Sequence, residues 1–208
     1  MKTKLFTIAL ILILSAPFAI AQTGEKGKMS FAILGGANFQ NLNGKLSSGD
    51  KLKNDMLLGF HGGVNVQIPL APEFYFQPGL MFAVKGAKNT TTIFGAEFTD
   101  ETKINYIEMP LNLVYKGALG NGFVMIGFGP YLAYGISGKQ VISGSSLTFE
   151  RGTDYKALDA GGNIFAGYET ASGIFLQLDT QFGMININPD ANITTKNTGF
   201  GLSLGYRF

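Results

Sequence analysis

Residues 106–115 read Tyr-Ile-Glu-Met-Pro-Leu-Asn-Leu-Val-Tyr, and this stretch decides the class of fold. Apolar residues occupy every second position, and Glu108, Pro110 and Asn112 stand between them. Successive side chains of a β-strand point to opposite faces, so one face of this strand is wholly apolar and the other carries a carboxylate and an amide. The end of the chain repeats the pattern. Its apolar face consists of Phe200, Leu202, Leu204, Tyr206 and Phe208.

The same period of two recurs along the chain and predicts eight strands. Most are about as long as the 9–11 residues with which a tilted strand crosses a bilayer. We expect strands at residues 29–39, 57–68, 74–85, 103–116, 123–136, 155–168, 174–184 and 198–208.

The connections between these strands alternate strictly in length. Residues 69–73, 117–122 and 169–173 form short turns, whereas long polar stretches such as 40–56 and 137–154 join the other pairs. This alternation is typical of outer-membrane barrels, which have short periplasmic turns and long extracellular loops. The prediction is an all-β fold, a closed eight-stranded antiparallel up-and-down transmembrane β-barrel of OmpX/OmpA-like shape.

Two alternatives share this strand pattern. In a soluble periplasmic lipocalin-like barrel, the apolar faces would point inward and hold an apolar ligand. A small-solute channel would keep the transmembrane orientation, but the interior of an eight-stranded barrel is only wide enough for side chains to fill. We therefore expect no open pore.

The first residues of the chain predict a secretory signal peptide. Lys2 and Lys4 precede an apolar run at residues 5–14, which is shorter than the ~20 residues that a spanning helix needs. No later segment approaches 18 consecutive apolar residues. A membrane location of the mature chain would therefore depend on strands.

The expected cleavage site divides the chain into a signal peptide, residues 1–21, and a barrel domain, residues 22–208. Ala19 and Ala21 form a small-x-small triplet, which predicts cleavage before Gln22. Cleavage removes two of the 16 basic residues and leaves 14 basic and 14 acidic ones. The mature chain thus offers no excess positive charge for nucleic acid.

Composition excludes several kinds of chemistry. The 208 residues include 29 Gly and 18 Phe but no Cys, which excludes disulfides, Cys-ligated metal centres, thiol catalysis and a lipid anchor on an N-terminal Cys. His61 is the only histidine, so a Ser–His–Asp triad would have to include it, and no Gly-x-Ser-x-Gly motif accompanies it. We therefore expect that the protein is not an enzyme and that it binds no cofactor.

Seven motifs together resemble the outer-membrane β-barrel family that is widespread in Bacteroidetes and often labelled porin family or PorT-like. At Gly79 the family often has an acidic residue instead. The resemblance implies an outer-membrane location but no particular substrate. The motifs are Gly35–Phe39, Phe60–Val64, Phe76–Leu80, Lys85–Lys88, Tyr106–Leu111, Gly129–Tyr131 and Gly205–Phe208.

The last strand also resembles the C-terminal signal that the barrel assembly machinery reads in outer-membrane proteins. Leu204, Tyr206 and Phe208 share its apolar face and would carry this signal.

Charged side chains in the middle of the strands fall on the polar face. Arg or Lys facing lipid at the midplane costs roughly 2–4 kcal/mol, so we expect these charges to point into the lumen and to pair there. Glu108, Asp159 and Asp179 are the expected partners of the cations. The predicted lumen network consists of Lys85, Glu108, Lys116, Asp159, Asp179, Arg207 and His61.

The four long loops are the expected site of function. They are polar and rich in hydroxyl groups, without a basic stripe. We expect a monomer in outer-membrane lipid with a structural, binding or adhesion role, exerted on an extracellular ligand or within an envelope complex.

Overall fold

The computed structural model describes residues 28–93, 96–142, 145–149 and 154–208, and nine β-strands make up most of this part of the chain. The strands are β1 (Ser30–Lys45), β2 (Leu57–Ala71), β3 (Phe74–Ile93), β4 (Ala96–Leu119), β5 (Gly122–Ile142), β6 (Ser145–Phe149), β7 (Leu158–Thr170), β8 (Ile174–Gly183) and β9 (Thr194–Arg207).

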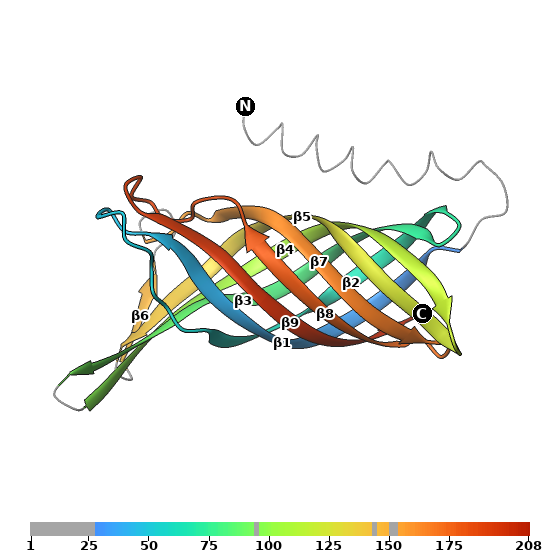
Figure 1. The fold of residues 1–208 in the computed structure, drawn as a ribbon, viewed down its shortest axis with the longest axis horizontal. Helices are drawn as coiled ribbons and strands as arrows, with labels where there is room; N and C mark the ends of the chain where they lie inside the picture. The colour runs from blue at the N-terminus through green and yellow to red at the C-terminus, as the bar shows by residue number, and fades with distance from the viewer. Residues whose placement is uncertain (1–27, 94–95, 143–144, 150–153) are drawn as a thin grey trace.

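Eight of these strands close into a ring in which every neighbouring pair is antiparallel. The pairings of β1 with β9 and of β4 with β5 complete the closure (Figure 1). The predicted eight-stranded up-and-down barrel is therefore confirmed. The short strand β6 lies outside the ring and pairs with the far end of β5.

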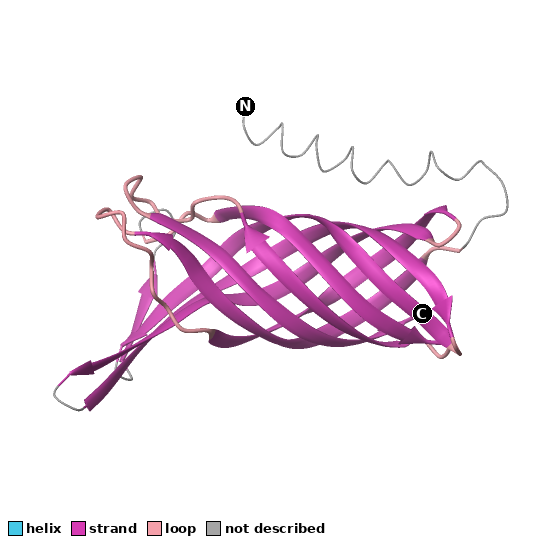
Figure 2. Ribbon diagram, in the orientation of Figure 1, coloured by secondary structure: helices cyan, strands magenta, loops and turns pink. Residues whose placement is uncertain are grey.

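The two ends of the barrel differ in their connections (Figure 2). At the short-turn end, two residues separate β2 from β3, two separate β4 from β5, and three separate β7 from β8. Gly173 makes the last of these turns with a φ of 89°, a left-handed conformation that favours glycine. The other end, the long-loop end, carries the remaining connections.

Burial alternates along each strand, with the apolar face outside. In β4, Ile107 and Tyr115 are exposed, while Tyr106, Glu108 and Asn112 are buried in the lumen. This orientation contradicts the lipocalin-like alternative, which required the apolar faces to point inward. Within the described residues there is no helix long and apolar enough to cross a membrane.

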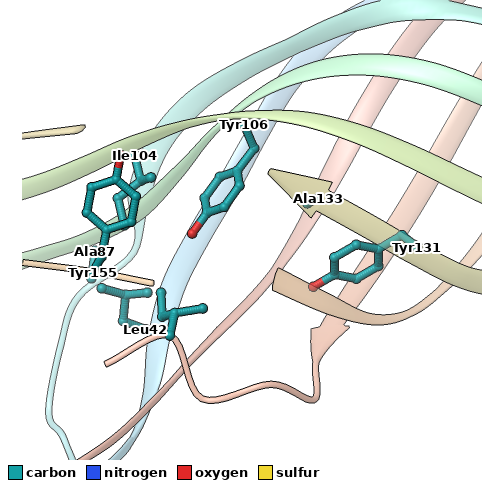
Figure 3. Packing of buried hydrophobic residues seen from close by; sticks show 8 residues of the cluster. Leu42, Ala87, Ile104, Tyr106, Tyr131, Ala133 and Tyr155 are labelled. Atoms are coloured by element: carbon teal, nitrogen blue, oxygen red, sulfur yellow. The ribbon is translucent and has the colours of Figure 1, made fainter. Parts of the chain in front are cut away.

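Two apolar clusters of side chains occupy the lumen. The cluster towards the long-loop end includes three tyrosines, and Figure 3 shows two of them, Tyr106 and Tyr131, with their hydroxyls in the barrel interior. The cluster towards the short-turn end contains Ala32, Leu34, Val114, Met125, Phe165 and Phe175. Phe175 points inward from β8, whereas its neighbours Ile174 and Leu176 are exposed on the outer face.

Several strands are longer than predicted, β3, β4 and β5 most of all. Residues 86–93, 96–102 and 137–142, expected to be loops, continue β3, β4 and β5 beyond the ring. With β6 they form a four-stranded antiparallel sheet that extends from the long-loop end. We call it the projecting sheet. Polar residues replace the alternating pattern there, so periodicity did not reveal it.

Candidate functional site: the charged lumen

The half of the lumen towards the long-loop end is organised around Lys85. Its Nζ lies 2.6 Å from Glu108 Oε1 and 3.8 Å from Asp159 Oδ2, and its side chain is fully buried. Two aromatic rings complete its surroundings, since Nζ lies 4.3 Å from the ring centroid of Tyr131 and 5.5 Å from that of Tyr106. One cation is thus held between two carboxylates and two π faces.

Hydrogen bonds anchor both carboxylates from other strands. The Tyr131 hydroxyl donates to Asp159 Oδ2 over 3.2 Å, and the Asn197 amide donates to the same oxygen over 2.9 Å. Gln181 donates to Glu108 Oε2 over 3.1 Å. The sequence reasoning missed Asn197 and the two tyrosines as members of the network.

The half towards the short-turn end has the opposite arrangement. Glu169 receives Lys116 Nζ at 2.6 Å on one oxygen and Arg207 Nε at 2.9 Å on the other. Arg207 also donates to the side-chain oxygens of Asn65 and Gln77. Glu169 was assigned to a turn by its place in the sequence, yet it is the carboxylate that both cations share.

A small chamber lies between the two networks, with a volume of about 70 Å³. Asp179 lines it but forms no ion pair with a described Lys, Arg or His side chain. His61 lines it too, and its Nε2 lies 2.6 Å from Ser203 Oγ. Of the seven residues predicted to form one network, five therefore take part in ion pairs, while His61 and Asp179 face the chamber.

The His61–Ser203 contact resembles half of a hydrolytic site. A working triad also needs a carboxylate that orients the imidazole, and no described carboxylate oxygen lies within 4.0 Å of a His61 nitrogen. Ser203 is fully buried, and the chamber is far smaller than the roughly 300 Å³ of small ligand pockets. The geometry does not assemble a triad.

The three residues expected to form an assembly signal lie on the outer face of β9 and just beyond it. Leu204 and Phe208 are 61 % and 75 % exposed, and the rings of Tyr206 and Phe208 meet edge to face with centroids 4.9 Å apart. The expected cleavage site at Ala19, Ala21 and Gln22 lies outside the described residues.

Residues 20–188 match the family described as "Outer membrane protein beta-barrel domain". The chain belongs to this family. This outer-membrane barrel therefore resides in the outer membrane, and the exposed apolar face of its ring strands contacts lipid. Its short-turn end is the periplasmic end, and its long-loop end is extracellular.

Two solved structures are among those similar to this outer-membrane barrel. The attachment invasion locus protein Ail of Yersinia pestis is 12 % identical, with 88 % of this chain and 100 % of Ail covered and a TM-score of 0.42. Neisserial surface protein A is 17 % identical, with 87 % and 98 % covered and a TM-score of 0.46. Among curated proteins, none matches the sequence.

Proposed function

We propose that this outer-membrane barrel is a non-enzymatic binding protein that attaches to an extended segment of an extracellular protein through its projecting sheet. The observation that carries the proposal is the pair of free sheet edges outside the ring. Within the described chain, β6 pairs only with β5, and residues 89–93 of β3 pair only with β4. A free edge presents unpaired N–H and C=O groups to which another strand can add.

The projecting sheet also exposes apolar side chains beyond the ring. Phe98 is 43 % exposed and Leu147 is 58 % exposed. Neither belongs to a strand segment of the ring, so bilayer contact does not account for their exposure. They would supply apolar contacts beside the backbone hydrogen bonds of an added strand.

Trimming one hairpin of the projecting sheet tests this proposal. Lys88 pairs directly with Glu101, so an Asn-Gly turn can join these two residues in place of residues 89–100. Cells that display the wild-type barrel should adhere to surfaces coated with a panel of extracellular proteins. We expect at least a tenfold loss of adhesion for the trimmed variant, because one edge and Phe98 are removed.

A matched control shortens the exposed turn at residues 46–50, which is extracellular but not part of the projecting sheet. This control should retain adhesion, and both variants should keep the gel mobility shift of a folded barrel. Equal adhesion of the trimmed and wild-type proteins would contradict the proposal.

The charged lumen takes a structural role in this proposal. Two apolar clusters and three ion-paired carboxylates cross the interior, which argues against the small-solute channel. Planar bilayers that contain the purified protein should show no stepwise conductance. Reproducible conductance steps would overturn this part.

We also propose that the outer face of the last strand guides assembly. The exposed Leu204, Tyr206 and Phe208 support a signal for the barrel assembly machinery. Removal of Phe208 should lower the fraction of heat-modifiable protein in the outer membrane. Normal insertion of that variant would contradict the signal.

Export and the finer family assignment are proposals as well. The charge and apolar pattern of residues 1–21 supports cleavage before Gln22, and mass spectrometry of the mature N-terminus tests it. The motif at residues 106–111 supports membership of the Bacteroidetes PorT-like branch, for which a profile built from that branch alone is the test.

A further inference from the structure

We propose that the chamber in the middle of the lumen binds a monovalent alkali cation, with Asp179 as its counter-charge. The chamber lies between the Lys85 network and the Glu169 network and is lined by Asp179, His61 and a ring of amide side chains. The proposal concerns the interior and is independent of binding at the projecting sheet.

The first argument is a charge balance. The Lys85 network holds one more carboxylate than cations, and the Glu169 network holds one more cation than carboxylates, so these two excesses offset each other. Asp179, which has no ion-paired partner among the described residues, leaves one further negative charge in the lumen. An uncompensated charge in a narrow lumen is costly, and a bound cation would offset it.

The second argument is that three residues lining the same chamber have side-chain oxygens without a hydrogen-bond partner. Asn38, Gln40 and Asn112 are each at least 95 % buried, and their side-chain carbonyl oxygens have no hydrogen-bond partner. The amide group of Asn38 donates to the Val84 carbonyl, which fixes its side chain by its nitrogen. Carbonyl and carboxylate oxygens are the ligands that hard cations take.

The size of the chamber and the absence of a side chain at Gly201 fit a hydrated cation. A volume of about 70 Å³ exceeds the ~10–15 Å³ that one water requires, so an ion and a few waters can share it. A Cβ at Gly201 would lie 2.9 Å from an Asp179 carboxylate oxygen and 3.1 Å from His61 Cε1. Glycine at position 201 thus keeps the space beside the carboxylate open.

A divalent metal fits the chamber less well. Within the described residues, no group of three or more His, Cys, Asp or Glu side chains is placed to hold a metal ion. A single unpaired carboxylate with neutral amide oxygens matches an ion of one positive charge.

The test compares cations at equal ionic strength. The purified barrel domain, residues 22–208, is refolded into detergent micelles in sodium, potassium or choline chloride. The measured quantity is the temperature at which the folded gel band converts to the unfolded band. A ligand that binds only the folded state raises this temperature. We expect sodium or potassium to raise it by about 2–4 °C over choline.

Two variants separate the chamber from surface effects. Asp179→Asn should remove the difference between alkali cations and choline, whereas Asp190→Asn, an exposed carboxylate in the β8–β9 loop, should retain it. Gln40→Leu, which keeps every charge, should reduce the difference if Asp179→Asn fails to fold. Equal temperatures in all three salts would show that water alone fills the chamber and overturn the proposal. An undiminished difference in Asp179→Asn would overturn it as well.

Discussion

The two halves of the lumen pair their buried charges in opposite arrangements. Towards the extracellular end, Lys85 is enclosed between Glu108 and Asp159 and has no solvent exposure. Towards the periplasmic end, Glu169 lies between Lys116 and Arg207 beside a cavity of about 330 Å³ at the barrel mouth.

This difference indicates that the burial of each network, more than its number of ion pairs, sets its contribution to the free energy of unfolding. Removing one partner of a desolvated pair leaves an uncompensated charge. Near the mouth, water and salt can take over part of the missing interaction. The mutations below test this contrast in order of expected effect.

The largest effect is expected for Lys85→Met. It leaves Glu108 and Asp159 buried without the cation that they share, so stability should fall by about 3–5 kcal/mol. Urea unfolding in lipid vesicles, followed by the gel mobility shift, measures the loss. Lys139→Met, at an exposed extracellular position, is the control and should behave like the wild type.

A smaller loss is expected for Glu169→Gln. Two cations lose their shared carboxylate, but they lie near the open mouth, so the cost should be about 1.5–3 kcal/mol. High salt should reduce this loss and leave the Lys85→Met loss unchanged. If both losses responded equally to salt, the contrast between the halves would be wrong.

Tyr131→Phe should cost about 1 kcal/mol, measured by the same unfolding assay. It removes the hydroxyl that donates to Asp159 while Asn197 and Lys85 remain in place. The ring over Lys85 Nζ also remains. A loss as large as that of Lys85→Met would mean that the tyrosine, and not the lysine, holds this network together.

Lys116→Met should have the smallest effect, below about 1 kcal/mol. Glu169 keeps its contact with Arg207, and the Lys116 side chain is already 11 % exposed. Comparison with Lys85→Met therefore tests the same substitution at the two ends of one lumen. A loss above that of Glu169→Gln would contradict the role given to Arg207.

Much of the ring followed from the sequence, because the period of two assigns each residue to one face. The alternation of turns and long connections predicted the strand order that the ring shows. Beyond the membrane, at residues such as Thr90–Thr92 and Lys139, the apolar alternation is lost. The period of two therefore did not predict β6 or the projecting sheet.

The sequence by itself determined which side chains point inward, since alternation depends only on position within a strand. It could not determine their height in the barrel, because strand tilt and register set which inward residues meet. Asp159 on β7 and Asn197 on β9 come together for this reason, although 38 positions separate them. The tertiary structure alone decided that Lys85 faces two carboxylates, that Glu169 faces two cations, and that Asp179 lies beside an open chamber.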